Sequence, residues 1–188
     1  MKTAALITIL LISSLLSSAT GTQDKWQDTD LSIRRLAPSA FQQLPENIAR
    51  YLQSRGCTVP QLWDEAVPHN VITGEFARKG QTDWAVLCSK NRVSSILIFW
   101  RGSTKSVAEI AREPDRNYLQ VVASDGKVGF SRMISGVGKD YILKHYREYG
   151  GLKPPPIDHQ GINNGYAEKG SVILYYFRGK WLRLQGAD

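Results

Sequence analysis

Asp158 and His159 are neighbours in the sequence, and their side chains form the pair in this chain best suited to acid–base chemistry. The prolines at positions 154–156 stiffen the loop that carries them, and loops on a rigid scaffold often carry function. An aspartate beside a histidine can serve proton transfer in a small hydrolase. The sequence has no G-x-S-x-G elbow for a nucleophile, so two alternatives stay open. Asp158 can cap backbone amides within the loop, or the pair can bind a ligand.

Tryptophan offers a second chemistry, because a large rigid ring can bind a carbohydrate or a peptide. Near the C-terminus Trp181 and Arg183 alternate with Leu182 and Leu184, which places the two pairs on opposite faces of a strand. We therefore predict Trp181 and Arg183 as an exposed ligand-binding pair, in which a positive charge lies beside the ring. A place in the core is the ordinary role for tryptophans in predicted strands, and this applies to Trp84 and Trp100.

The sequence contains two cysteines, Cys57 and Cys88. Because the chain begins with a predicted export signal, an oxidising compartment makes a single disulfide the economical pairing. Closing a loop of about 30 residues stabilises a protein by roughly 3 to 4 kcal/mol in the loop-entropy model. The two cysteines are therefore expected to form a structural bridge.

The three histidines show no spacing typical of a metal site. His69 follows a proline in a predicted loop, His145 lies among tyrosines in a predicted helix, and H-E-x-x-H is absent. The two cysteines have no histidine ligands nearby, which argues against zinc. We expect no metal ion and no cofactor.

Two segments are predicted to be helices that position these groups. Residues 44–56 have Pro45 at a first helical position and Gly56 at the end, and Ile48 and Leu52 share one face. Residues 141–149 carry apolar and aromatic side chains at helical spacing before two glycines. Both helices are expected to pack on a sheet.

Short runs rich in β-branched and aromatic residues predict antiparallel strands at 70–76, 83–89 and 94–100. Apolar residues alternate onto both faces of the second run, so both of its faces are expected to be covered. Asp125-Gly126 is a preferred turn pair and predicts a further hairpin between 118–132.

The C-terminal part of the chain is predicted to contain a polar loop at 158–165 and a hairpin that joins 171–177 to 181–185. Together these segments predict an α+β fold, an antiparallel sheet of about seven strands with two helices packed on it and one disulfide.

The first residues predict export. One lysine precedes an apolar run from Ala4 to Leu16, which is too short to span a bilayer and gives way to small polar residues. Residues 1–19 are therefore predicted to be a signal peptide that is cleaved after Ala19. A periplasmic or secreted protein that does not span the membrane is expected.

The remainder of the chain is predicted to be a flexible N-terminal segment over residues 20–37 and a single α+β domain over residues 38–188. Lys and Arg number 24 against 17 Asp and Glu, which gives a formal net charge of +7. The positive residues are scattered, so no segment is typical of a nucleic-acid-binding tail. The excess charge favours solubility and also suits an anionic envelope surface or an acidic polysaccharide.

A glycine, an aromatic residue, a turn glycine and an aspartate that opens a strand stand at Gly74, Phe76, Gly80 and Asp83. In these positions residues 73–102 resemble a single hairpin repeat of the FG-GAP and VCBS type, which forms the blades of secreted β-propellers. The family's calcium loop is acidic, whereas Arg78 and Lys79 stand in it here, so the resemblance implies no calcium ion. The pattern does not recur, and one blade cannot close a propeller. The resemblance therefore implies only a hairpin within a small α+β domain.

Two further features of the chain are Arg55-Gly56-Cys57 after the first predicted helix and the Pro-Pro-Pro-Ile-Asp-His run that ends at His159. With these features, the chain from residue 44 onward resembles an uncharacterised family of exported bacterial proteins. This resemblance implies export and supplies no activity.

Three hypotheses for the function follow. The leading one is a non-enzymatic binding or inhibitor-like module of the cell envelope, with a basic, tryptophan-bearing sheet face that meets an anionic envelope component or another protein. The alternatives are a small hydrolase that uses Asp158 and His159 and a structural periplasmic domain. The hydrolase alternative leaves an enzymatic role open.

Overall fold

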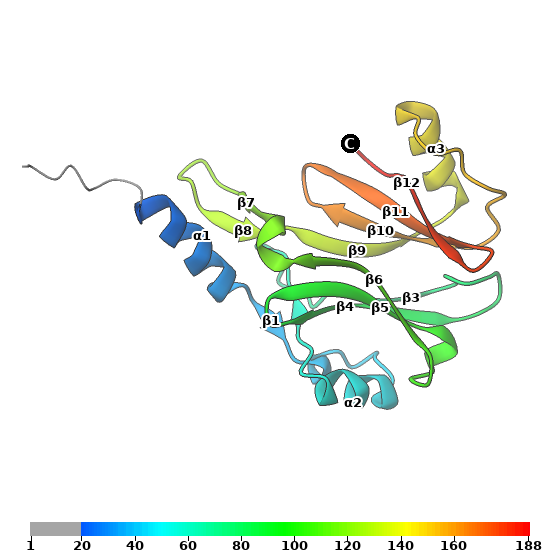
Figure 1. The fold of residues 1–188 in the computed structure, drawn as a ribbon, viewed down its shortest axis with the longest axis horizontal. Helices are drawn as coiled ribbons and strands as arrows, with labels where there is room; N and C mark the ends of the chain where they lie inside the picture. Colours follow the sequence, from blue (N-terminus) through cyan, green and yellow to red (C-terminus); the bar gives the residue numbers. More distant parts are fainter. Residues whose placement is uncertain (1–19) are drawn as a thin grey trace, which may run out of the picture.

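The structure, a computed structural model, describes residues 20–188. The predicted signal peptide over residues 1–19 lies outside the described residues. Two four-stranded antiparallel sheets lie face to face, with helix α2 (Glu46–Ser54) against the outer face of one and α3 (Lys139–Tyr149) against the outer face of the other (Figure 1). The described part of the chain is thus a β-sandwich between two helices.

The first sheet has the strand order β3-β4-β5-β6, and all neighbouring strands are antiparallel. Its central strands are β4 (Asp83–Lys90) and β5 (Val93–Phe99), and its edges are β3 (Val71–Gly74) and β6 (Val107–Pro114). The three strands predicted for this part of the chain are confirmed as β3, β4 and β5. Strand β6 was not predicted from the sequence.

The second sheet has the order β12-β11-β10-β9, again with antiparallel neighbours. The predicted terminal hairpin is confirmed as β11 (Gly170–Phe177) and β12 (Lys180–Gln185). The other two strands are β9 (Arg132–Val137) and β10 (Gly161–Tyr166). The predicted second helix is confirmed as α3, which lies between β9 and β10 in the chain.

The remaining strands form two two-stranded sheets. β7 (Leu119–Val121) and β8 (Val128–Phe130) form the hairpin predicted from Asp125-Gly126. β1 (Arg35–Leu36) pairs with β2 (Val59–Pro60). Three short 3-10 helices connect these elements: η1 (Pro38–Ala40), η2 (Trp100–Gly102) and η3 (Asp115–Tyr118).

The main core lies between the two large sheets. Ala85 and Leu87 of β4 point into it, whereas Val86 and Cys88 point toward α2, so both faces of β4 are covered as predicted. Burying a side chain of the size of leucine stabilises the fold by about 1.5 to 3 kcal/mol. Buried side chains from both sheets fill the core: Phe76, Ile96, Ile98, Ile134, Ile162 and Leu174.

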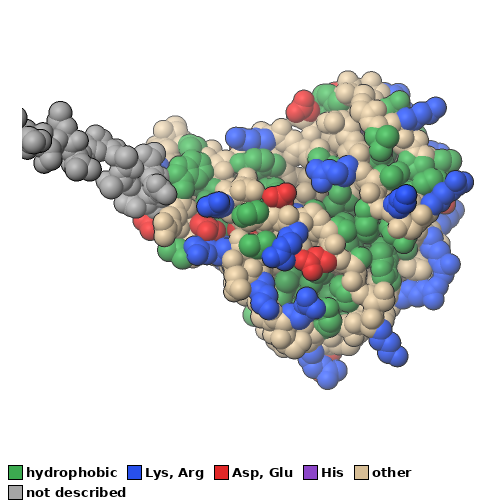
Figure 2. All heavy atoms as spheres, in the orientation of Figure 1, with side chains coloured by type: hydrophobic (Ala, Val, Ile, Leu, Met, Phe, Trp, Pro, Cys, Tyr) green, Lys and Arg blue, Asp and Glu red, His purple; other side chains and the backbone are tan. Residues whose placement is uncertain are grey.

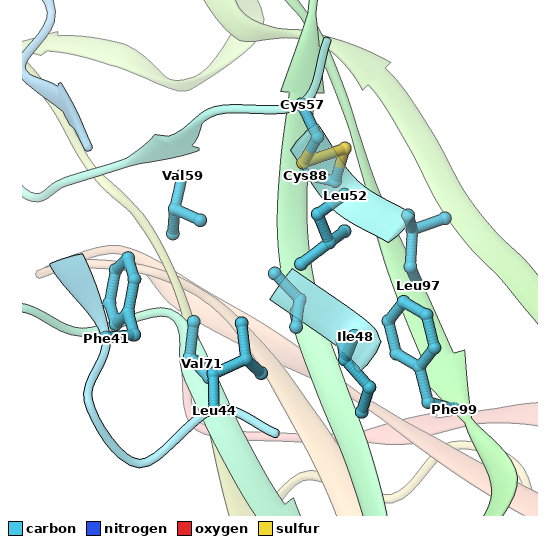
Figure 3. Packing of buried hydrophobic residues seen from close by; sticks show 11 residues of the cluster. Phe41, Leu44, Ile48, Leu52, Cys57, Val59, Val71, Cys88, Leu97 and Phe99 are labelled. Carbon is cyan, nitrogen blue, oxygen red and sulfur yellow. A yellow bond between two sulfur atoms is a disulfide. The ribbon is translucent and has the colours of Figure 1, made fainter. Parts of the chain in front are cut away.

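Helix α2 packs on the first sheet through Ile48 and Leu52, which are fully buried (Figure 3). The helix ends at Ser54, and Gly56 just beyond it has a φ of 68°, in the left-handed region that favours glycine. Cys57 follows at once and is disulfide-bonded to Cys88 on β4, with a Cα–Cα distance of 5.5 Å. The predicted bridge is confirmed, and it ties the end of α2 to a central strand.

The expectation of one sheet with about seven strands is wrong. The described residues form twelve strands in four antiparallel sheets, together with three α-helices. The physical reason is that β4 and β5 are apolar on both faces, so each face needs its own cover. One face receives α2 and the other receives the second sheet.

The polar loop predicted at 158–165 is also wrong, because Gly161–Tyr166 forms the central strand β10. The glycine and asparagine residues of this strand have separate reasons, one steric and one a hydrogen bond. A Cβ atom on Gly161 would lie 2.8 Å from Cγ2 of Ile173, so the neighbouring strand leaves no space for a side chain. Asn164 on the same strand accepts a hydrogen bond from the buried Arg132.

Helix α1 (Thr20–Ser32) occupies most of residues 20–37, for which a flexible segment was predicted. Asp30 at its end is buried and forms an ion pair of 3.4 Å with Arg35, which in turn pairs with the buried Asp115 at 2.7 Å. Ion pairs therefore connect this polar segment to the sandwich, and a search for apolar periodicity does not detect them.

Arg132, the first residue of β9, is fully buried between the sheets. Its guanidinium donates hydrogen bonds to the backbone and side-chain oxygens of Ser94 on β5, the carbonyl of Ala111 on β6 and the side chain of Asn164 on β10. It also lies 4.5 Å from the ring centroid of Tyr118. Burial lowers the pKa of Arg132. One side chain thus links both sheets through hydrogen bonds.

Candidate functional site

Three aromatic side chains from both sheets meet at one end of the sandwich. Trp100 stands in η2 at the end of β5, Tyr176 on β11 and Trp181 on β12. The rings of Trp100 and Trp181 stack with centroids 5.9 Å apart, and Tyr176 lies 5.1 Å from Trp100 and 5.3 Å from Trp181. We call these three residues the aromatic cluster. Each is half-buried, so part of each side chain remains accessible.

The aromatic cluster is positioned by the strand register and by an unusual turn. Tyr176 and Trp181 are direct partners in the β11–β12 ladder, and cross-strand aromatic pairs stabilise a hairpin. The chain turns after Trp100, where Arg101 and Gly102 have φ values of 52° and 68°. A non-glycine residue in this region costs on the order of 1 kcal/mol or more, so the surroundings must hold Arg101 in place.

Asp83, the first residue of β4, supplies that hold. It is fully buried, and its Oδ2 accepts hydrogen bonds from the backbone N–H groups of Phe76 and Ala77 at 3.1 and 3.0 Å. Its Oδ1 accepts from the backbone N–H of Arg101 at 2.9 Å and from the side-chain amide of Gln81 at 2.8 Å. Hydrogen bonds to a carboxylate are among the stronger ones. Asp83 therefore fixes the β3–β4 loop against η2.

Exposed cationic side chains stand on the loops that carry or adjoin the aromatic cluster. Figure 2 shows Lys and Arg side chains along the edge where Figure 1 draws the β3–β4 loop and the β11–β12 turn. None of these side chains forms an ion pair within residues 20–188, which leaves their charge available to an anionic partner. We call them the basic rim: Arg78, Lys79, Arg101, Arg178 and Lys180.

The two residues predicted to bind a ligand both lie on β12, but only Trp181 joins the aromatic cluster. Trp181 is half-buried rather than exposed, because it stacks on Trp100 and packs against the core between the sheets. Arg183 is exposed and lies opposite Leu174 in the ladder. Leu184 is buried in the core under α3, so the predicted alternation of faces along β12 is observed.

Asp158 and His159 lie in different environments, since the Asp158 side chain is 72% exposed and the His159 side chain is buried. Nδ1 and Nε2 of His159 are each 2.9 Å from a backbone oxygen, of Gln160 and Tyr176 respectively. The ring also stacks on Tyr175 with centroids 4.3 Å apart. A general base needs a lone pair directed at its substrate, and both nitrogens face the backbone. The catalytic hypothesis gains no support from this geometry.

The same contacts fit the loop-structuring alternative. The Tyr175 hydroxyl donates to Oδ1 of Asp158 at 3.1 Å and accepts from the Asp158 backbone N–H at 3.3 Å. Burial raises the pKa of Tyr175, so its hydroxyl keeps the proton that it donates at neutral pH. The expected partner of the Asp158 carboxylate was a backbone amide, whereas the structure gives it a phenol.

The remaining histidines have structural contacts. Nε2 of His69 accepts a hydrogen bond from the backbone N–H of Leu62 at 2.9 Å, and burial lowers the pKa of His69. His145 is buried on α3, with Nδ1 2.8 Å from the backbone oxygen of Tyr141. Residues 20–188 contain no group of three or more side chains arranged to hold a metal ion.

No family model, curated protein or solved structure matches this chain. The fold and the site alone therefore define its class, a disulfide-linked β-sandwich between two helices with an aromatic cluster and a basic rim at one end. The resemblances to a propeller hairpin and to a family of exported proteins stay expectations. Among the helices of residues 20–188, none has both the length and the apolar character needed to cross a bilayer.

Tyr176 and the basic rim were not predicted from the sequence, and Trp100 was expected in the core. A signal for Tyr176 was present, since a tight turn at Arg178-Gly179 makes Tyr176 and Trp181 direct partners. The meeting of Trp100 with Trp181 depends on how the two sheets stack, and no local pattern contains that information.

Proposed function

We propose that this protein is an exported, non-enzymatic binding module of the cell envelope, and that its aromatic cluster and basic rim bind an anionic polysaccharide. The observation that carries the proposal is the stacking of Trp100 on Trp181 beside exposed cationic side chains without ion-pair partners. Large apolar rings next to unpaired positive charge suit a ligand that is both ring-shaped and acidic.

Each part of the surface has a role in this proposal. The apolar C–H faces of a sugar ring pack on the parts of the aromatic cluster that remain accessible, where aromatic residues offer contact area at little entropic cost. The basic rim attracts acidic groups over a distance of about 8 to 10 Å at physiological salt. Rings and acidic groups alternate along an acidic polysaccharide, so both features are used at once.

Export is supported by the disulfide and by the predicted signal peptide. A disulfide that joins α2 to β4 fits an oxidising compartment, because thiols in the cytosol are kept reduced. The formal net charge of +7 favours contact with anionic material of the envelope.

The experiment is a binding titration of the purified protein with a fluorescent oligouronate and with a neutral oligosaccharide of equal length. We expect the oligouronate to bind and Trp181→Ala to weaken it by about tenfold or more, which is the loss of 1.4 kcal/mol. Trp181→Phe keeps a ring and is expected to retain most of the affinity. Trp26→Ala is the matched control, since Trp26 is 38% exposed on α1 away from the aromatic cluster.

Two results would overturn the proposal. One is equal binding, or equal absence of binding, for the oligouronate and the neutral oligosaccharide. The other is a Trp181→Ala variant that folds, as judged by its melting temperature, and binds as well as the Trp26→Ala control.

A further inference from the structure

Two arginines of the basic rim are held on one amide oxygen, and we infer that they form an oxyanion site that selects the acidic groups of the ligand. Arg78 comes from the β3–β4 loop and Arg101 from η2. The identity of the polymer rests on the proposed function, whereas anion binding by the two arginines does not.

Gln81 brings the two guanidinium groups together. The Nε atoms of Arg78 and Arg101 each donate to Oε1 of Gln81 at 3.1 Å. Both groups therefore lie side by side on a single acceptor. Within residues 20–188, these are the only side-chain hydrogen bonds of either arginine, so the terminal nitrogens keep their donors for a ligand.

The orientation of Gln81 is itself fixed. Its Nε2 donates to Oδ1 of the buried Asp83 at 2.8 Å, and an amide that donates through nitrogen on one side presents its oxygen on the other. Asp83 forms no ion pair with either arginine side chain, since its oxygens accept from the backbone N–H groups of Phe76, Ala77 and Arg101 and from the side chain of Gln81. Within residues 20–188 no carboxylate contacts either guanidinium.

Two guanidinium groups that share one acceptor repel each other, and a bound anion offsets that repulsion. Arg101 also has a left-handed φ of 52°, which Asp83 holds in place. Strained residues of this kind cluster at binding sites. The two arginines also line an open depression together with Lys79, Gly80, Gln81 and Thr82.

The chemistry of the ligand follows from that of guanidinium. Two planar guanidinium groups match a group with at least two acceptor oxygens, such as a carboxylate, a sulfate ester or a phosphate. Arg101 directly follows Trp100 in the chain, so a sugar on the aromatic cluster places an acidic group within reach of the pair. The site therefore selects acidic over neutral sugars.

The test compares three variants with a charge-matched control. Arg78→Ala removes one guanidinium, and Arg101→Gly removes the other while accepting the left-handed backbone. Gln81→Ala changes no charge but releases both side chains. Lys144→Ala on α3 is the control, because Lys144 is exposed on the helix over the outer face of the second sheet.

Isothermal titrations use a carboxylated oligosaccharide, a sulfated oligosaccharide, and inorganic sulfate and phosphate. We expect each of the three variants to bind the preferred oligosaccharide about tenfold or more weakly than the wild type does. In the two arginine variants the affinity should also depend less steeply on the salt concentration. The control is expected to bind as the wild type does. The two oligosaccharides distinguish carboxylate from sulfate as the group that is recognised.

The outcomes separate this inference from the proposed function. If Trp181→Ala abolishes binding of the polymer while the Gln81 and arginine variants behave as Lys144→Ala does, the oxyanion site is wrong and the function stands. If no polysaccharide binds but sulfate or phosphate binds in a manner that depends on Arg78, Arg101 and Gln81, the site stands and the function is wrong. A Gln81→Ala variant that folds and binds every anion normally contradicts a built site.

Discussion

The indole rings of Trp100 and Trp181 stack with their planes at 17°, although one follows a strand of the first sheet and the other lies on an edge strand of the second. The stack therefore joins the two sheets at the same end as Asp83 and the basic rim. A ligand bound there contacts both sheets at once, so its affinity depends on their packing as well as on the surface side chains.

Asp83 is predicted to be essential for the two loops that carry Arg78 and Arg101. Asp83→Ala leaves four donors without their acceptor and should lower the free energy of unfolding by about 3 kcal/mol or more. Asp83→Asn keeps one acceptor oxygen and should cost less than alanine but still about 1 to 2 kcal/mol. Urea denaturation measures both, and an asparagine variant as stable as the wild type would contradict the role assigned to the carboxylate.

The bridge between Cys57 and Cys88 spans a sequence separation of 31. Replacing both cysteines by serine should lower the free energy of unfolding by roughly 3 to 4 kcal/mol in the loop-entropy model. Denaturation of the oxidised protein, compared with the double variant, gives the value. Mass spectrometry after alkylation of the oxidised protein provides the control, and a protein that carries two alkyl groups would contradict the bridge.

His69 is predicted to make stability depend on pH. Burial is the main cause that lowers its pKa below 6.5, opposed by the backbone oxygen of Val67 and by the charge of Glu65. Just below pH 6.5 the unfolded chain therefore binds more protons than the folded one. The contribution of His69 to the free energy of unfolding is fully present above pH 6.5 and is lost as the pH falls through the folded pKa.

The His69→Gln variant isolates this contribution, because glutamine can still accept the hydrogen bond from the backbone of Leu62. We expect the difference in unfolding free energy between the wild type and the variant to change from about pH 7 to pH 5. A difference that stays constant over that range would show that His69 titrates alike in the folded and unfolded states.

Arg132 is predicted to be among the most sensitive positions of the fold. Arg132→Met keeps much of the volume but removes the guanidinium donors to the carbonyl oxygens of Ser94 and Ala111, which should cost about 3 kcal/mol or more. Arg112→Met is the control, because Arg112 is exposed and should change stability by less than about 0.5 kcal/mol. If the two variants have equal melting temperatures, the buried guanidinium does not stabilise the sandwich.

The sequence was informative wherever local chemistry decides the structure. Pro45, Gly56 and the spacing of Ile48 and Leu52 are typical of a capped amphipathic helix, and α2 forms there. The alternating apolar residues of β4 indicated that both faces are covered, and they are. The pairing of the two cysteines followed from their number.

What the sequence did not reveal depends on contacts between distant segments. β10 has little apolar character, because Gly161 makes way for Ile173 and Asn164 serves a buried arginine, so its pattern resembles a loop. Likewise, Arg78 and Arg101 are separated in the chain and meet only through Gln81. Such relationships arise from tertiary packing, which periodicity does not encode.

Nuclear magnetic resonance of the indole N–H groups shows whether the aromatic cluster binds an acidic sugar polymer. In a titration of the nitrogen-15-labelled protein with an oligouronate, we predict that the signals of Trp100 and Trp181 shift together and saturate at one Kd. The signal of Trp63 should stay in place, because Trp63 lies beside β8, where its backbone N–H donates to the carbonyl of Phe130. Silent Trp100 and Trp181 signals at saturating oligouronate, or shifts confined to other tryptophans, would contradict the account.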